Sequence, residues 1–255
     1  MISLLVVVAS ALFMQDRSVE YQPGLALHIY QPEGWKADQH RTAIVFFFGG
    51  GWTGGTVKQF EPHARLFASQ GVVAICADYR VMSRHHTTPF EAIADGKAAI
   101  AYVRSHAGEL GIDPKRIVAA GGSAGGHVAA SAAILPPTDH RIAALVLFNP
   151  VVDTTSAGYG AEKVAGREIE ASPTHHISKG APPAILFHGT ADITVPFANA
   201  EAFCQRLRSV GSRCELVPYA DQKHGFFNLA REDGKYYRDS VDRTVRFLRS
   251  LHLID

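Results

Sequence analysis

Excess charge of either sign, cysteine and long hydrophobic runs are all scarce in this 255-residue sequence. It contains 25 Lys and Arg against 24 Asp and Glu, without a Lys/Arg run, which argues against a nucleic-acid partner. Three cysteines are too few for a scaffold built on disulfides. With 47% hydrophobic residues and little net charge, the composition is not that of a disordered chain. We therefore expect one globular domain with a large hydrophobic core.

The apolar segment over residues 2–14 is too short for a membrane-spanning helix, which needs about 20 residues. Its length suits a signal peptide, and Ala9-Ser-Ala11 resembles a cleavage site, although no Lys or Arg precedes Arg17. The alternative is an ordinary buried strand or helix. We expect residues 1–15 to be a signal peptide of a periplasmic or secreted protein, or otherwise part of a cytoplasmic one. The single domain then covers residues 16–255, without stable membrane insertion.

Two of the cysteines are ten positions apart, at the ends of a predicted helix and a predicted strand. Cys204 and Cys214 form either a disulfide, worth about 2–3 kcal/mol, or two reduced buried thiols. Cys76 lies inside an apolar run and is predicted to be a core residue.

Short apolar runs alternate with segments of helical period along the chain. The runs predict strands buried on both faces, because polar residues hardly alternate within them: residues 43–48, 72–77, 117–120, 144–148, 184–187 and 215–219. Helices are predicted between and after them: residues 59–69, 89–106, 125–134, 199–210 and 236–251. This order predicts an α/β fold with a mostly parallel sheet of about eight strands and helices on both faces. Residues 19–30 predict a hairpin that turns at Pro23-Gly24 and adds an antiparallel edge.

One long stretch, residues 151–183, shows neither clear sheet nor clear helix character. Long loops in compact domains are often functional, so we interpret it as a small flap over the site. A plain connecting segment is the alternative.

The segment Gly121-Gly-Ser-Ala-Gly-Gly126 fits the pattern G-x-S-x-G, directly after a predicted strand and before a predicted helix. In that context the central serine sits on a sharp, strained turn, and small residues on both sides let strand and helix pack closely. The amino end of the helix also favours negative charge at the site. Ser123 is therefore the candidate nucleophile.

A serine nucleophile needs a histidine base that is oriented by a carboxylate, and in this architecture the chain order is Ser, acid, His. Asp192 follows the predicted strand over residues 184–187, and His224 follows the strand over residues 215–219. Because ligands bind at the carboxyl ends of parallel strands, we expect Ser123, Asp192 and His224 to converge.

Other residues compete for these roles. Asp153, which follows the strand over residues 144–148, is the alternative acid, whereas Asp78 and Asp95 are interpreted as structural. Among the histidines, His188 is interpreted as a structural residue at a strand end and His127 as a packing residue on the helix after the nucleophile.

A metal or an organic cofactor is not expected. The adjacent pairs His85-His86 and His175-His176 invite a metal interpretation, but neighbouring side chains rarely face one ion and no further ligands accompany them. The glycine-rich segments lack the spacing of a dinucleotide fingerprint, and no GxxxxGK[ST] motif is present.

Acyl transfer also needs backbone donors that meet the negative charge developing on the carbonyl oxygen. The turn Phe48-Gly-Gly-Gly-Trp52 follows a predicted strand, and its glycines allow the backbone to approach a ligand closely. We predict that Gly50, Gly51 and Ala124 form an oxyanion hole and that Trp52 binds substrate.

These motifs together resemble the α/β-hydrolase fold, and more narrowly the esterases related to hormone-sensitive lipase and to bacterial acetyl xylan and feruloyl esterases. The matching segments cover most of the chain from about residue 19 onward: Phe48-Gly-Gly-Gly-Trp52, Asp78-Tyr-Arg80, Gly111-Ile-Asp-Pro-Lys-Arg-Ile117, Gly121-Gly-Ser-Ala-Gly-Gly-His127, Ser172-Pro173, His188-Gly-Thr-Ala-Asp192 and His224-Gly-Phe-Phe227. The resemblance implies the triad Ser123, Asp192 and His224, with Gly50, Gly51 and Ala124 as oxyanion donors.

The sequence departs from this family at two points. Phe48 stands where the family has a histidine that is thought to brace the glycine loop, which puts the rigidity of that loop in question. The first core strand begins near Val19, which leaves no room for the helical cap of hormone-sensitive-lipase relatives. We expect little or no cap, and hence acetyl or feruloyl esters of carbohydrates rather than long-chain lipids.

The predicted function is a serine carboxylesterase that works through an acyl-enzyme on a small-molecule or carbohydrate ester. The alternatives are a peptidase of the prolyl-oligopeptidase type and a non-catalytic binding protein with a hydrolase fold. The sequence makes no prediction of the oligomeric state.

Overall fold

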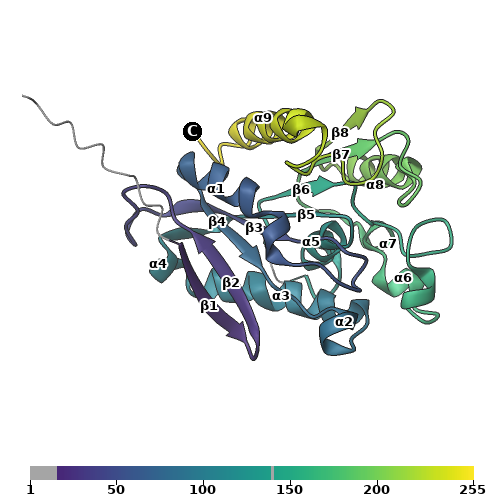
Figure 1. The fold of residues 1–255 in the computed structure, drawn as a ribbon, viewed down its shortest axis with the longest axis horizontal. Helices are drawn as coiled ribbons and strands as arrows, with labels where there is room; N and C mark the ends of the chain where they lie inside the picture. The colour runs from purple at the N-terminus through teal and green to yellow at the C-terminus, as the bar shows by residue number, and fades with distance from the viewer. Residues whose placement is uncertain (1–15, 139–140) are drawn as a thin grey trace, which may run out of the picture.

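The computed structural model describes residues 16–138 and 141–255. The predicted signal peptide over residues 1–15 lies outside the described residues. All eight strands of this part join one sheet in the order β1-β2-β4-β3-β5-β6-β7-β8 (Figure 1). Their bounds are β1 Asp16–Gln22, β2 Leu25–Tyr30, β3 Arg41–Phe47, β4 Val73–Ala77, β5 Ile112–Gly122, β6 Ala144–Phe148, β7 Ala184–Gly189 and β8 Cys214–Tyr219.

The sheet is mostly parallel, as predicted. Strands β3 to β8 pair in parallel, whereas β1 and β2 form an antiparallel hairpin and β2 pairs antiparallel with β4. The hairpin turns at the predicted Pro23-Gly24, where Gly24 has a φ of 74°. The largest difference in strand bounds is in β5, which begins at Ile112 rather than at residue 117.

The described residues form α-helices α1 Glu61–Ser69, α2 Met82–His85, α3 Pro89–Ser105, α4 Ala107–Leu110, α5 Ala124–Ile134, α6 Glu168–Ala171, α7 Pro173–His176, α8 Phe197–Ser209 and α9 Lys235–Ser250. Short 3-10 helices cover η1 Val57–Gln59, η2 Ala161–Lys163 and η3 Glu232–Gly234. The five predicted helices correspond to α1, α3, α5, α8 and α9. No helix of the described residues is both long and apolar enough to cross a membrane.

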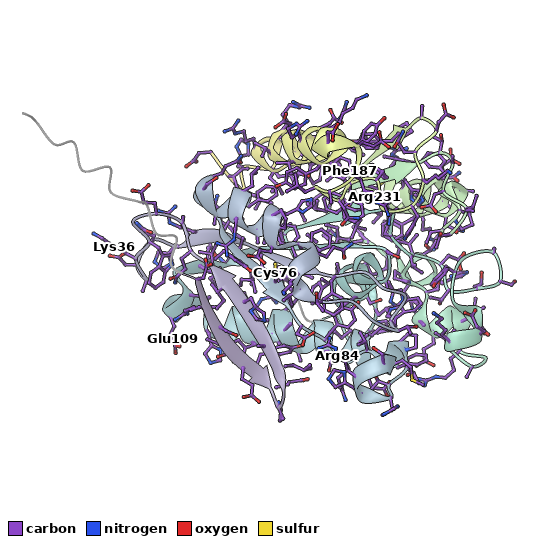
Figure 2. All side chains as sticks on the ribbon, in the orientation of Figure 1. Lys36, Cys76, Arg84, Glu109, Phe187 and Arg231 are labelled. Atoms are coloured by element: carbon purple, nitrogen blue, oxygen red, sulfur yellow. A yellow bond between two sulfur atoms is a disulfide. The ribbon has the colours of Figure 1, made fainter. Side chains whose placement is uncertain are left out.

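Helices cover both faces of the sheet (Figure 1), and a hydrophobic layer lies between the helices and the sheet on each face. Helices α1 and α9 pack on one face with Phe46 of β3, and helices α3, α5 and α8 pack on the other with Phe47 of the same strand. Because successive side chains of a strand point to opposite faces, strands covered on both sides need unbroken apolar runs. Cys76 lies inside the molecule (Figure 2), and burial raises the pKa of its thiol well above the usual range, so it stays protonated.

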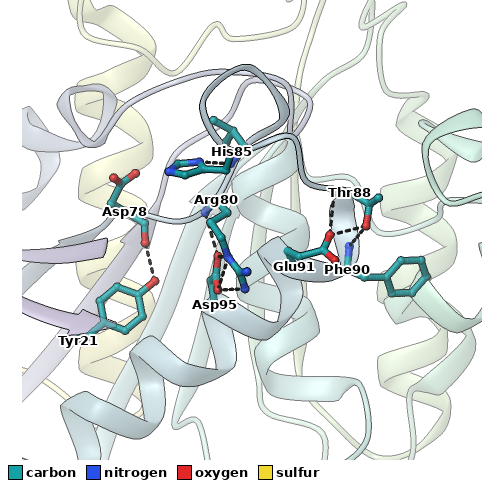
Figure 3. A network of polar contacts seen from close by, with 9 residues as sticks. Tyr21, Asp78, Arg80, His85, Thr88, Phe90, Glu91 and Asp95 are labelled. Carbon is teal, nitrogen blue, oxygen red and sulfur yellow. Dashed lines mark hydrogen bonds and ion pairs between the residues drawn. The ribbon is translucent and has the colours of Figure 1, made fainter. Parts of the chain in front are cut away.

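A polar network fixes the chain after β4 (Figure 3). The hydroxyl of Tyr21 donates to the carbonyl of Asp78 at 2.7 Å, which ties the hairpin to this segment. Arg80 pairs through two nitrogens with the fully buried carboxylate of Asp95 on α3, at 2.7 Å for the closest contact. Thr88 begins α3 with a capping box. The interpretation of Asp78 and Asp95 as structural agrees with these contacts.

The structure joins Cys204 of α8 and Cys214 of β8 in a disulfide. This is the first of the two alternatives that the sequence left open. The bridge fixes helix α8 to the last strand of the sheet, in the part of the chain between Asp192 and His224.

Candidate active site

The candidate nucleophile lies on the turn between β5 and α5. Ser123 has a φ of 55° and a ψ of −123°, a backbone conformation that residues with a side chain rarely adopt. Its N–H donates to the carbonyl of Phe148 at 2.9 Å, which holds the turn to strand β6. A Cβ atom at Gly125 would overlap the carbonyl oxygens of Phe47 and Phe48, so helix and strand approach this closely only with glycine here.

The structure brings the three predicted triad residues together. His224 Nε2 lies 2.9 Å from Ser123 Oγ, and His224 Nδ1 lies 2.7 Å from Asp192 Oδ2. Asp192 follows β7 and His224 follows β8, so both reach the site from the carboxyl ends of parallel strands, as expected. The Asp192 carboxylate is fully buried, whereas the His224 side chain is 25% exposed. With Asp192 ionised, Nδ1–H donates to it and Nε2 is left to accept a proton from the serine hydroxyl.

The surroundings of Asp192 keep it ionised. Burial alone would raise its pKa, but hydrogen bonds from His188 and His224 and from the backbone of Val195 hold the pKa well below its usual range. The N–H groups of Thr194 and Val195 donate to Oδ1 at 2.9 and 3.0 Å, and His188 Nε2 lies 3.4 Å from Oδ2. A carboxylate with this many donors stays charged at neutral pH and orients the histidine.

The other candidates for the triad, His188 and Asp153, make different contacts from His224 and Asp192. His188 is fully buried at the end of β7, where its single Nε2–H is shared between the carbonyl of Val195 at 3.0 Å and Asp192 Oδ2 at 3.4 Å. It supports the acid loop, which fits the structural role predicted for it. Asp153 accepts from Thr155 N–H at 2.8 Å within its own loop, and no hydrogen bond or ion pair joins it to His224 in the described part of the chain.

Sequence reasoning missed Asn149, which directly follows β6. It is fully buried with a φ of 33°, and asparagine tolerates such left-handed angles better than most residues. Its Oδ1 accepts from the N–H of Gly225 at 3.0 Å, and its Nδ2 lies 3.4 Å from His224 Nε2. An Asn at the carboxyl end of a buried strand, the edge that carries the site, is the signal that would have found it.

The glycine loop over residues 48–55 carries two of the predicted oxyanion donors. Gly50 has a φ of 129° and Gly51 a φ of 61°. Among residues 16–138 and 141–255 none accepts a hydrogen bond from the N–H groups of Gly50, Gly51 or Ala124. The three predicted donors thus have no hydrogen-bond partner within these ranges. The loop is held from outside, because Met82 N–H donates to the carbonyl of Trp52 at 2.9 Å.

Phe48, where the family has histidine, is braced by an aromatic contact. Its ring stacks on Tyr79 with centroids 4.2 Å apart, and both side chains are buried. The Tyr79 hydroxyl donates to the carbonyl of Phe48 at 2.6 Å. The start of the glycine loop is thus fixed by packing and one backbone contact rather than by a polar histidine.

Trp52 departs from its predicted substrate-binding role. Its side chain is 2% exposed and packs edge-on against His127, with ring centroids 5.0 Å apart. Gly160 covers the same indole so closely that a Cβ there would clash with it. A ring this enclosed offers almost no surface to a ligand, so Trp52 anchors the glycine loop in the core. His127 is the predicted packing residue: burial lowers its pKa to about 4, and its Nε2 donates to the carbonyl of Ala171.

The segment over residues 151–183 lies against the glycine loop. Lys163 Nζ donates to the carbonyl of Gly51 at 3.1 Å and lies 3.4 Å from Thr53 Oγ1, and the hydroxyl of Tyr159 is placed close above Gly51. These contacts fit the interpretation of a small flap. Three short helices that the sequence did not indicate, η2, α6 and α7, form within this stretch.

The adjacent histidine pairs make local hydrogen bonds. His85 Nδ1 accepts from Val81 N–H at 3.1 Å, and His175 Nδ1 lies 2.9 Å from Ser172 Oγ. Within the described ranges, no group of three or more His, Cys, Asp or Glu side chains is arranged to hold a metal ion.

Several known proteins resemble this chain in sequence and in structure. The model of the BD-FAE family matches residues 27–163, which include the glycine loop and the nucleophile turn. The chain belongs to the BD-FAE family. It is 33% identical over 243 residues to the probable carboxylic ester hydrolase LipM of Mycobacterium tuberculosis, covering 82% of this chain and 55% of LipM. The chain thus spans about half the length of the first curated relatives it matches.

Solved structures of esterase 2 from Thermogutta terrifontis match nearly the whole of this BD-FAE chain. The form phosphoramylated by tabun is 43% identical with a TM-score of 0.87, covering 94% of this chain and 96% of that one. The propionate-bound form is 42% identical with a TM-score of 0.88, covering 94% and 95%. These matches confirm the α/β-hydrolase fold and the resemblance to serine esterases of the hormone-sensitive-lipase type, and they support the classification as a carboxylesterase.

Proposed function

We propose that this protein is a serine carboxylesterase that hydrolyses short-chain acyl esters through an acyl-enzyme. The observation that carries the proposal is the hydrogen-bonded series Asp192, His224, Ser123, with distances of 2.7 and 2.9 Å. A non-catalytic protein has no need for a buried, ionised carboxylate aligned through an imidazole on a strained serine.

In the first step Ser123 Oγ attacks the ester carbonyl while His224 Nε2 takes the hydroxyl proton. His224 then returns this proton to the departing alcohol oxygen, and the acyl group stays on Ser123 as an ester. A water molecule attacks the acyl-enzyme with His224 again as the base, and the acid is released as Ser123 regains its proton. Asp192 stays ionised throughout and stabilises the imidazolium.

The negative charge of each tetrahedral intermediate lies on the former carbonyl oxygen. The free N–H groups of Gly50, Gly51 and Ala124 supply three donors for it, and each is worth about 3–4 kcal/mol of transition-state stabilisation. The amino end of α5, which begins at Ala124, adds a favourable dipole.

The acyl group we propose is short, such as acetyl, or feruloyl, on a carbohydrate alcohol. The propionate-bound esterase 2 supports a short acyl group, since that relative is 42% identical over nearly the whole chain. We further propose that the protein works in an oxidising compartment after export, which the Cys204–Cys214 disulfide supports.

The test is to compare the wild type with Ser123→Ala on p-nitrophenyl acetate. We expect kcat to fall by at least about 10⁴-fold while the thermal unfolding midpoint stays within a few degrees. Ser105→Ala, at an exposed serine, is the matched control and should keep full activity. Unchanged turnover in Ser123→Ala would reject the assignment. A wild type that hydrolyses no ester in the series acetyl, butyryl, octanoyl, feruloyl and acetylated xylan would favour a binding protein.

A further inference from the structure

The two halves of the candidate machinery come from distant parts of the chain. The glycine loop follows β3, near the amino terminus, and His224 follows β8, near the carboxyl terminus. The side chain of Gln59, at the end of η1, lies between them. The N–H of Gly49 donates to Gln59 Oε1 at 2.6 Å, and Gln59 Nε2 donates to Asn228 Oδ1 at 3.1 Å. These two bonds set the orientation of the Gln59 amide.

Asn228 continues the series into the histidine loop. Both its Nδ2 and its N–H donate to the carbonyl of Gly225, at 2.8 and 3.2 Å. The N–H of Gly225 in turn donates to Asn149 Oδ1 at 3.0 Å. The residue next to His224 is therefore held at its N–H and at its carbonyl, and one hydrogen-bonded series runs from Gly49 to the catalytic imidazole.

The hydrogen-bonded series begins next to the predicted oxyanion donors. Gly49 precedes Gly50 and Gly51, and its own N–H donates to Gln59, whereas the next two N–H groups have no acceptor among the described residues. Gln59 and Asn228 are both half-buried, so water competes only partly for their amides.

We propose that Gln59 and Asn228 are positioning residues that couple the oxyanion loop to His224. One side-chain network then fixes the positions of the oxyanion donors and of the histidine base relative to each other. The inference rests on the proposed esterase function. Neither residue touches the reacting atoms. Their effect is to hold two groups that act on the same transition state, and small displacements of such groups lower kcat more than they weaken substrate binding.

The experiment compares Gln59→Ala, Asn228→Ala and the double variant on p-nitrophenyl acetate. We expect each single variant to lower kcat about 10- to 100-fold with KM within about 2-fold, and the double variant to fall no further than the worse single. Gln59→Glu keeps an acceptor for the Gly49 N–H but loses the donor to Asn228 Oδ1, so the coupling predicts that its kcat stays as low as that of Gln59→Ala. Gln205→Ala, an exposed glutamine on α8, is the control and should match the wild type.

Two kinetic outcomes overturn the proposal: single variants that keep kcat within about 2-fold, or losses that multiply in the double variant, since independent sites multiply. A readout that does not need turnover is the NMR resonance of the His224 Nδ1 proton. It should shift in Gln59→Ala and stay in place in Gln205→Ala, and an unmoved resonance in Gln59→Ala also rejects the coupling. If the wild type shows no Ser123-dependent hydrolysis, the proposed function fails, and this resonance still decides the coupling.

Discussion

The nucleophile turn and the histidine loop are built on opposite principles. The turn at Ser123 is fixed locally, by a strand, a helix and glycines packed so closely that no side chain fits between them. The loop after β8 has little regular structure before η3, and it is held by side chains from other elements: Gln59, Asn149 and Asp192. A local backbone constraint leaves a short motif in the sequence, whereas a loop held by distant side chains does not.

The largest effect is expected from breaking the local constraint. Gly125→Ala places a methyl group against two backbone carbonyls that cannot move independently. We expect loss of folded, soluble protein or a large fall in the unfolding midpoint, with activity lost in either case. Gly108→Ala, where a Cβ meets open space, is the control and should fold normally. Circular dichroism and thermal melts of both variants give the answer, and a stable, active Gly125→Ala would contradict the packing argument.

The next effect comes from the histidine side. Asp192→Asn keeps the shape but removes the charge that orients and stabilises the imidazole. We expect kcat to fall roughly 10³- to 10⁴-fold, while the fold is kept. Asp153→Asn, at the competing acid, is the matched control and should lose less than about 10-fold. Steady-state kinetics on p-nitrophenyl acetate distinguish the two variants. A larger loss of kcat in Asp153→Asn would identify Asp153, and not Asp192, as the acid of the triad.

A smaller effect is expected on the stability of the fold, with little effect on catalysis. Reducing the disulfide, or replacing Cys204 and Cys214 by serine, releases α8 from β8 between the acid and the histidine. We expect the free energy of unfolding to fall by about 2–3 kcal/mol while kcat at 25 °C changes little. Amides that exchange only through global unfolding should lose about 2–3 kcal/mol of protection throughout the molecule, and any additional loss should be found in α8 and β8. An additional loss at the nucleophile turn would contradict the separation of the two sides.

The smallest effect is a dependence on pH that originates under the histidine loop. His63 is fully buried against Phe227 and Tyr237, and burial lowers its pKa to about 3. Because the unfolded histidine has a pKa near 6.5, the unfolded chain binds the proton first, so stability is full above that value and declines as pH falls toward 3. Between pH 7 and 5 this amounts to about 2 kcal/mol from His63.

Urea unfolding at several pH values measures this slope. His63→Phe should flatten it by about that amount, and His86→Asn, at an exposed histidine, should leave it unchanged. An identical slope in His63→Phe would show that other groups carry the acid sensitivity.

The contrast between local backbone constraints and loops held by distant side chains explains which features the sequence predicts well. The strands, the five long helices and Ser123 follow from patterns of neighbouring residues. Asp192 and His224 follow from chain order and from their place at strand ends. Gln59, Asn149 and Asn228 carry no such pattern, because each amide is identified only by a partner far away in the chain. Trp52 shows the converse, since its place beside the glycines suggested substrate contact while its ring is enclosed.

The position of β8 at the end of the sheet has a consequence for association between molecules. An outermost strand presents unpaired backbone groups to which a strand of another molecule can add. Pro218 removes one N–H donor from this strand, and the ion pair of Arg213 with Glu215 places charge along it. Both features disfavour the addition of a foreign strand at this end of the sheet.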